Sequence, residues 1–84
     1  MTKRQKLLTR FLSNPTDFSW NELITLLSGF GFQQASSGKT GGSRVRFLND
    51  NHPPIILHKP HPRPTLKRYQ INIIIEFLRQ ENLI

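Results

Sequence analysis

Residues able to carry acid–base chemistry are concentrated in one short stretch, H-K-P-H-P-R-P, from His58 to Pro64. Within it, His61 lies between Lys59 and Arg63, and neighbouring positive charges favour the neutral imidazole that a general base must offer. Cleavage of RNA needs such a base to take the proton of a ribose 2′-OH, together with cations that stabilise the pentacoordinate phosphate. The stretch therefore suits RNA cleavage, with His61 as the lead base and His58 as the other candidate. It equally suits phosphate binding by the same groups acting as donors.

A second stretch, S-S-G-K-T-G-G-S-R from Ser36 to Arg44, looks like the end of a nucleotide-binding P-loop. A P-loop requires a glycine five positions before Gly38 and a helix directly after Lys-Thr. Gln33 stands at the first place, and two glycines and a strand pattern follow at the second. We therefore interpret the stretch as a hairpin loop in which glycines supply the positive φ angles. Its backbone N–H groups, beside Lys39 and Arg44, can hold a phosphate of a nucleic-acid strand.

The three histidines could also be considered as metal ligands. Prolines hold His58 and His61 in an extended arrangement, and Asp50 is the only nearby carboxylate. The chain has no cysteine, which excludes disulfides and thiolate metal sites. We expect no metal and no small-molecule cofactor. His52 stands among turn-forming residues and is interpreted as a solvated loop residue.

Positive charge is the strongest signal in the composition. The 84 residues hold 12 Lys and Arg against 5 Asp and Glu, a formal net charge of +7. Such a surface attracts polyanions, of which nucleic acid is the most common. A membrane is a rival, but no apolar run approaches the roughly 18–20 residues of a membrane span or resembles a signal peptide, so we expect a cytoplasmic protein.

Much of this charge is expected to face one region and to hold a nucleic-acid backbone, with a scattered solubilising surface as the alternative. The cations concerned are Lys39, Arg44, Arg46, Lys59, Arg63, Lys67 and Arg68.

Two helices are expected before the first strand. Leu7, Leu8, Phe11 and Leu12 fall on one face of a helix from Thr2 to Ser13, which Asn14-Pro15 ends. Ser19 and Glu22 form the S-x-x-E capping box of the next helix, and Phe18 can staple onto Leu23 across the cap. Gly29 or Gly31 supplies its C-terminal stop.

The period then changes to that of strands. Phe32–Ser36 is a weak strand candidate, Arg44–Leu48 alternates with Val45 and Phe47 on one face, and Pro54–His58 follows a predicted turn over residues 49–53. Thr65 is the expected cap of a last helix from Leu66 to about Asn82. Its apolar face is predicted to include Leu66, Tyr69, Ile73, Ile74, Phe77 and Leu78. The order is α-α-β-β-β-α, an α+β domain with helices covering one face of a sheet.

Aromatic residues are mostly interpreted as core. Trp20 and most of the others stand at the spacing of buried residues. Tyr69 is the exception. It is a candidate for stacking on a nucleic-acid base, because it lies near the start of the predicted last helix beside Lys67 and Arg68.

The combination of G-S-R-V-R-F, I-I-L-H-K-P-H-P-R-P and a C-terminal helix resembles the HicA family of type II toxins, small bacterial mRNA interferases paired with an antitoxin. The resemblance runs from Trp20 to the C-terminus and implies a double-stranded-RNA-binding-like α-β-β-β-α layer fold with an extra N-terminal helix. It also implies metal-independent endoribonuclease activity on mRNA and neutralisation by a HicB-like antitoxin. We expect one domain over residues 1–84, with residues 1–15 as the N-terminal helical extension of a HicA subgroup and 19–84 as the core.

One departure from the family pattern bears on the chemistry. Typical HicA members carry G-S-H, whose histidine is catalytic, whereas here Gly42 and Ser43 match and Arg44 stands in the third place. Either His61 or His58 acts with Arg44 as an anion stabiliser, or the protein binds RNA without cutting it. Two non-catalytic readings therefore stand beside the toxin: a nucleic-acid-binding module, and a regulator whose basic face is covered by an acidic antitoxin. Among the residues implied to bind RNA is Ser43.

Overall fold

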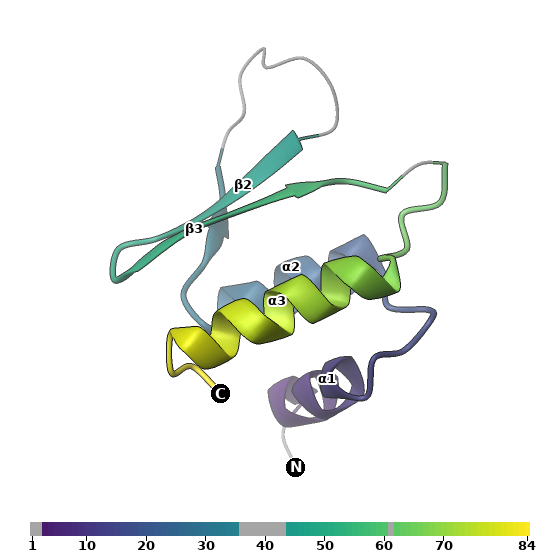
Figure 1. The fold of residues 1–84 in the computed structure, drawn as a ribbon, viewed down its shortest axis with the longest axis horizontal. Helices are drawn as coiled ribbons and strands as arrows, with labels where there is room; N and C mark the ends of the chain where they lie inside the picture. Colours follow the sequence, from purple (N-terminus) through teal and green to yellow (C-terminus); the bar gives the residue numbers. More distant parts are fainter. Residues whose placement is uncertain (1–2, 36–43, 61) are drawn as a thin grey trace.

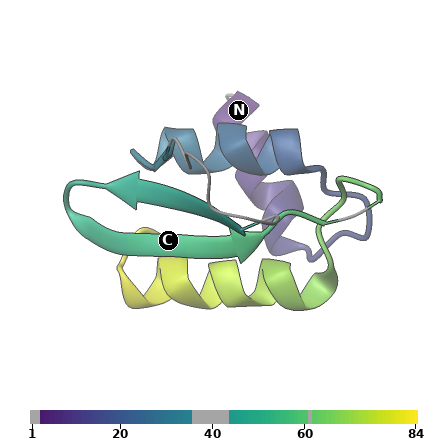
Figure 2. The same cartoon turned by 90° about the horizontal axis from the view of Figure 1, so that it is seen from above.

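Residues 3–35, 44–60 and 62–84 are described by the structure, a computed structural model. Within these ranges the elements are α1 (Lys3–Leu12), α2 (Trp20–Gly29), β1 (Gln33–Gln34), β2 (Arg44–Asn49), β3 (His52–His58) and α3 (Arg68–Gln80). The strands build an antiparallel sheet in the order β1-β2-β3. Figures 1 and 2 show α2 and α3 running beside each other along one face of the sheet, with α1 on the far side of the helices from the β2–β3 hairpin. This is the expected α+β layer fold, α-β-β-β-α with an extra N-terminal helix.

α1 packs through a narrow apolar stripe. Phe11 is fully buried, and its ring centroid lies 4.9 Å from that of Phe18. Leu7 and Leu8 are partly buried against the same core, but Leu12 is 40% exposed, so its predicted place on the buried face is wrong. Leu12 is rotated about 100° around the helix from Phe11, and a helix on the surface of a small domain buries only the residues nearest its partner.

The predicted capping box at the start of α2 is confirmed. The Ser19 hydroxyl accepts from the Glu22 N–H at 3.1 Å, and the Ser19 N–H donates to the Glu22 carboxylate at 2.9 Å. Phe18 and Leu23, the expected staple, are both fully buried. The hydrogen bond from the Ser19 backbone lowers the pKa of Glu22, and the Arg10 guanidinium, 2.6 Å from the carboxylate, lowers it further.

Gly31 supplies the C-terminal stop of α2. Its φ of 93° is left-handed, a conformation that glycine adopts without steric cost. The Gly31 N–H donates to the Ser28 carbonyl, and the Phe32 N–H to the Leu27 carbonyl, each at 3.0 Å. These are the two bonds of a Schellman motif, and the buried side chains of Leu27 and Phe32 supply its hydrophobic part.

The β2–β3 hairpin alternates as predicted. Val45 and Phe47 of β2 and Ile55 and Leu57 of β3 are buried, while the residues between them are exposed. Trp20 is 2% exposed and its ring lies 5.8 Å from that of Phe47, which confirms its packing role. Because successive side chains of a strand point to opposite faces, one face of the hairpin covers the helices and the other faces solvent.

The hairpin turn is shorter than predicted. Asn49 pairs with His52, so β3 begins two residues before the expected Pro54 and contains Pro53 as well. β3 is an edge strand, where a proline without an N–H breaks no ladder bond. Because residues 49–53 are rich in turn-forming types, the sequence pattern did not indicate this pairing.

Thr65 does not cap the last helix, and that prediction is wrong. Thr65 instead forms an antiparallel bridge with Ser19, and the Leu66 N–H donates to the Phe18 carbonyl at 2.8 Å. These bonds hold residues 65 and 66 extended beside the start of α2, so α3 begins only at Arg68.

The buried face of α3 also differs from the prediction. Ile71, Ile74, Ile75 and Leu78 line the core, and Phe77 is partly buried. Two side chains predicted on this face, Tyr69 and Ile73, are 58% and 56% exposed. The run of isoleucines offers two overlapping apolar stripes, and packing on the sheet selects one of them.

Candidate nucleic-acid interface

Arg44 and His58 stand opposite each other at the open end of the β2–β3 hairpin. Their Cα atoms are paired in the antiparallel register, and both residues are exposed. Directly opposed residues have Cβ atoms about 4.5–5.5 Å apart, so the two side chains leave the same face of the sheet as neighbours. The hairpin therefore brings an imidazole and a guanidinium together although 13 residues separate them in the sequence.

The solvent face of the hairpin extends this pair. Arg46 is exposed two residues further along β2, opposite Ile56 of β3. Alternation places Arg44, Arg46 and His58 on one face, the face turned away from the core.

The start of α3 is tied to the end of β3 by one buried polar side chain. Gln70 is 4% exposed, its Nε2 donates to the His58 carbonyl at 2.8 Å, and its Oε1 accepts from the Lys67 N–H at 3.0 Å. These bonds bring Lys67 and Arg68, both exposed, next to the open end of the hairpin. We call this region the basic corner; it consists of Arg44, Arg46, His58, Lys59, Lys67 and Arg68.

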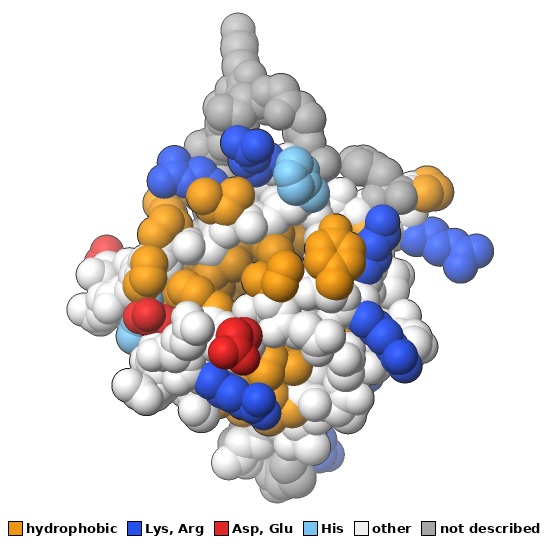
Figure 3. All heavy atoms as spheres, viewed as in Figure 1, with side chains coloured by type: hydrophobic (Ala, Val, Ile, Leu, Met, Phe, Trp, Pro, Cys, Tyr) orange, Lys and Arg blue, Asp and Glu red, His pale blue; other side chains and the backbone are white. Residues whose placement is uncertain are grey.

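Among the described residues, the cations of the basic corner have no acidic partner. In the described part of the chain, ion pairs join Arg10 to Asp17 and Glu22, and His52 to Glu81, and none involves a residue of the corner. Figure 3 shows several Lys and Arg side chains and a histidine around the upper part of the face in view. Unpaired cations on one corner leave a positive potential that an anion can neutralise.

Lys67 and Arg68 also stand where a helix disfavours positive charge. They occupy the N-cap and first position of α3, whose first turn carries no acidic residue. The partial positive charge of a helix N-terminus makes each nearby cation unfavourable by about 0.3–1 kcal/mol, whereas an anion there is favoured. The arrangement costs stability in the free protein and suits an anionic ligand.

The structure describes part of the predicted proline-rich site. Lys59 and Arg63 are exposed, and Pro60 is buried. Downstream, the Trp20 N–H donates to the Pro64 carbonyl at 2.8 Å, so this segment lies against the start of α2. Three predicted site residues lie outside the described residues: Lys39, Ser43 and His61.

His52 is not the solvated loop residue that its neighbours suggested. Its Nδ1 lies 2.8 Å from a carboxylate oxygen of Glu81, and its ring centroid lies 6.2 Å from that of Phe32. It begins β3, at the opposite end of that strand from His58. His52 therefore links the hairpin turn to the C-terminal end of α3 and is not part of the basic corner.

Gln70 is the site residue that sequence reasoning missed. A signal was present, because glutamine three residues after an N-cap position is the second half of a capping box. Lys67 cannot supply the first half, since an ammonium only donates, so the sequence shows only half of the pattern there.

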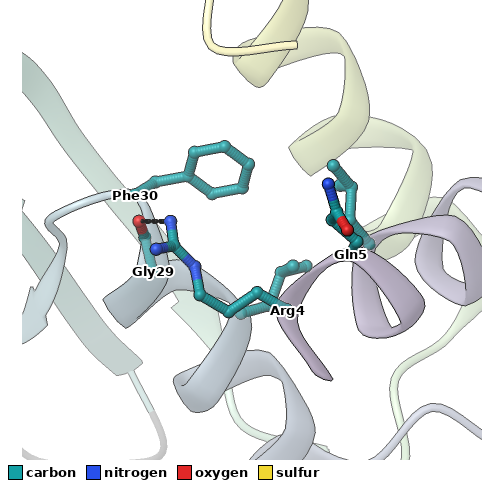
Figure 4. A pocket seen from close by; sticks show the side chains of 6 residues that line it. Arg4, Gln5, Gly29 and Phe30 are labelled. Carbon is teal, nitrogen blue, oxygen red and sulfur yellow. Dashed lines mark hydrogen bonds between the residues drawn. The ribbon is translucent and has the colours of Figure 1, made fainter. Parts of the chain in front are cut away.

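A separate pocket of about 340 Å³ lies between α1 and α2 (Figure 4). Arg4 extends across it, and its guanidinium donates to the Gly29 carbonyl at the end of α2. A Cβ at Gly29 would lie 2.8 Å from the Arg4 side chain, so the arginine would have to shift if another residue stood there. The hydrogen bond from Arg4 links the start of α1 to the end of α2.

The described residues offer neither a cluster of metal ligands nor a membrane-spanning helix. Among them, no three histidine or carboxylate side chains gather as they would around a metal ion. Nor does any helix in residues 3–35, 44–60 and 62–84 combine the length and apolar character needed to cross a membrane.

The bounds of a family match agree with the bounds of the helices and the sheet. A family model described as the HicA toxin of bacterial toxin–antitoxin systems matches residues 20–81. Searches of curated proteins and of solved structures each returned no match. The match begins at the first residue of α2 and ends at Glu81, just after α3, so it spans the sheet and both covering helices and leaves α1 outside. The chain belongs to the HicA family, the toxins of bacterial toxin–antitoxin systems.

Proposed function

We propose that this protein is a metal-independent endoribonuclease that cleaves mRNA at the basic corner. The observation that carries the proposal is the cross-strand pair of Arg44 and His58, exposed on one face of the hairpin in a chain of the HicA family. An imidazole and a guanidinium side by side are the two groups that cleavage next to a ribose hydroxyl requires.

The chemistry uses the substrate's own nucleophile. A neutral imidazole takes the proton of a ribose 2′-OH, and the oxygen attacks the adjacent phosphorus. The bond to the 5′-oxygen breaks, that oxygen takes up a proton, and a 2′,3′-cyclic phosphate remains on the upstream fragment. Arg44 and Lys59 stabilise the negative charge that grows on the phosphate oxygens. A side-chain base and fixed cations suffice for this step, so it needs no metal ion.

Two histidines compete for the role of base. His61 is the lead candidate from the sequence, because Lys59 and Arg63 flank it. His58 is supported by its register opposite Arg44 and by its exposure. The remaining basic-corner cations Arg46, Lys67 and Arg68, together with Lys39, Ser43 and Arg63, hold the RNA backbone in this proposal.

We further propose that a HicB-like antitoxin neutralises the protein and that both act in the cytoplasm, where mRNA is found. A cation-rich corner that forms no ion pair within residues 3–35, 44–60 and 62–84 suits coverage by an acidic protein surface. Residues 1–15 would then be a helical extension of a HicA subgroup on a core of residues 19–84.

A binding module without catalysis is the second candidate. It is favoured by Arg44, which stands where typical HicA members carry their catalytic histidine. In that case the same cations hold RNA and no proton is removed.

End-labelled single-stranded RNA, incubated with the purified protein in excess EDTA and read on a denaturing gel, tests the proposal. We expect discrete fragments from wild type and from His52→Gln, a matched histidine variant whose ring is engaged with Glu81 at the other end of β3. Loss of fragments in His61→Ala alone, or in His58→Ala alone, identifies the base.

The contrary result is intact RNA in every lane at protein concentrations that retard the same RNA in a native gel. That result would reject cleavage and support the binding module. Fragments that disappear in EDTA and return with added Mg²⁺ would instead reject the metal-independent step.

A further inference from the structure

Tyr69 is a large aromatic residue exposed to solvent beside the basic corner. It is 58% exposed, whereas Trp20 and Phe11, Phe18, Phe32 and Phe47 are buried. Tyr69 also lies at the second position of α3, between cations and the buried Gln70. An exposed ring at such a place contributes little to the core and is accessible to a ligand.

The side chains around the ring are suited to an anionic nucleic-acid strand. Lys67 and Arg68 precede Tyr69 and are exposed and without acidic partners in the described part of the chain. The next residue, Gln70, donates to the His58 carbonyl at 2.8 Å, so the start of α3 is fixed to the strand end that carries the candidate base. Figure 3 shows hydrophobic side chains exposed over α3, bordered by Lys and Arg.

An aromatic ring flanked by cations matches the two parts of a nucleotide. The cations attract the phosphate, and the ring offers a flat apolar surface to a base. In a duplex both faces of each base are already covered by its neighbours, so only an unpaired base can stack on a protein side chain.

We propose that Tyr69 is a stacking platform for an unpaired base next to the cleaved phosphate, and that it makes the protein selective for single-stranded RNA. The inference rests on the proposed function, in that it takes RNA as the substrate. It adds to that function a binding subsite for one unpaired base and a selectivity for single-stranded over duplex RNA.

A protein partner is the competing occupant, because Ile73 is 56% exposed one turn after Tyr69 on the same face of α3. A protein would use both side chains as apolar surface, whereas a stacked base uses the ring of Tyr69. If a base stacks there, affinity for RNA depends on Tyr69 and not on Ile73.

Affinity for a non-cleavable strand tests the proposal apart from catalysis. The probe is a single-stranded oligonucleotide with 2′-O-methyl ribose, which lacks the nucleophilic hydroxyl, and the same sequence annealed to its complement is the comparison. Wild type is expected to bind the single strand more tightly than the duplex at equal salt. Tyr69→Ala is expected to lose on the order of tenfold to a hundredfold in affinity for the single strand, the effect of one base–aromatic stack, and little for the duplex.

Three variants sharpen the result. Tyr69→Phe keeps the ring and should bind as wild type, Tyr69→Leu keeps apolar area without a ring and should behave as Tyr69→Ala, and Ile73→Ala should bind as wild type. Both sites, Tyr69 and Ile73, are exposed, so folding is expected to persist and is checked by thermal unfolding.

The proposal is overturned if Tyr69→Ala binds the single strand as tightly as wild type does, or if Tyr69→Leu does so. Equal losses of single-strand affinity in Tyr69→Ala and Ile73→Ala would mean that the strand contacts a broad apolar surface rather than one ring, and would also overturn it. A wild-type protein that binds neither probe nor cleaves RNA removes this inference and the proposed function together, whereas RNA cleavage unchanged in Tyr69→Ala removes only the inference.

Discussion

The chemistry of single residues centres on Arg44, which is exposed and paired with His58 across the hairpin. A guanidinium stays protonated at physiological pH and cannot act as a base, but it can stabilise a phosphate through two parallel hydrogen bonds. We therefore expect Arg44→Ala to lower the single-turnover cleavage rate by about 10²–10³-fold, as for loss of one transition-state donor. RNA affinity should change much less. Arg44→Lys should recover part of the rate, because an ammonium keeps the charge and loses the paired donors.

Arg46→Ala is the matched control for this experiment, since Arg46 is exposed on the same strand and face, two residues further along. It should weaken binding and leave the rate of the bound complex unchanged. Equal effects of the two alanine variants on that rate would contradict a specific role of Arg44 in the transition state.

Gln70 is expected to act through the position of His58. Gln70→Leu removes both hydrogen bonds, to the His58 carbonyl and from the Lys67 N–H, a loss of about 0.5–1.5 kcal/mol for each. Gln70→Glu keeps an acceptor for Lys67 and loses the donor to His58. We therefore expect both variants to cleave more slowly at saturating RNA, with Gln70→Glu the more stable of the two in thermal unfolding.

A purely structural role would give the opposite pattern for Gln70→Glu. Its cleavage rate at saturating RNA would equal that of wild type once the folded fraction is taken into account, and only its melting temperature would fall.

Among the elements, α2 depends most clearly on local sequence. Ser19→Ala removes the hydroxyl that caps the Glu22 N–H and should lower the free energy of unfolding by about 1 kcal/mol. In a domain of this size that corresponds to roughly 4–8 °C in melting temperature. Ser13→Ala is a suitable control, because the Ser13 hydroxyl bonds a carbonyl within its own segment at the end of α1. Comparable losses from both variants would argue against the cap as the cause.

The same cap makes stability depend on pH. The pKa of Glu22 is lower in the folded protein, chiefly through the Ser19 N–H and then Arg10, so the carboxylate stabilises the fold at a pH above its unfolded pKa. That contribution is lost as the pH falls through the folded pKa. Chemical denaturation of wild type and Glu22→Gln should therefore give stability curves that converge in acid and diverge towards neutral pH. Parallel curves would contradict the assignment.

Elements defined by neighbouring residues could be predicted from the sequence. The capping box, the glycine stop and the alternation of Val45 and Phe47 all depend on residues a few positions apart. Thr65 and His52 were misassigned because distant partners decide their conformation: Ser19 bridges Thr65, and Glu81 holds His52. Local propensity cannot contain such contacts.

The same distinction applies to the candidate site. The basic stretch around His58 and the unusual Arg44 could be recognised as residue types, but their pairing depends on strand register. The role of Gln70 depends on where α3 begins, and the bridge between Ser19 and Thr65 delays that start to Arg68. Sequence therefore identifies the chemical groups, and tertiary contacts decide which of them meet.

The whole molecule depends on α1 although the family match begins after it. Phe11 is fully buried and packs on Phe18 at the entry to α2, in one cluster with the rest of the core. Phe11→Ala should cost about 3–5 kcal/mol, the usual loss for a large aromatic in a core. We therefore expect a chain starting at residue 16 to unfold at much lower denaturant concentration than the full chain. An unchanged midpoint would mean that residues 19–84 fold as an independent core.

The net charge of +7 leads us to a prediction about the salt dependence of RNA affinity. Each phosphate neutralised on a single strand releases counterions and contributes about −0.7 to the slope of log affinity against log salt concentration. If the basic corner carries the contacts, the double variant Lys67→Gln, Arg68→Gln should reduce the magnitude of the slope by about 1.4. Lys3→Gln, Lys6→Gln removes the same charge from exposed positions on α1, across the helices from the hairpin, and should leave the slope nearly unchanged. Equal reductions would mean that RNA responds to the total charge, whereas a reduction confined to the first pair places the phosphates on the corner that holds Arg44 and His58.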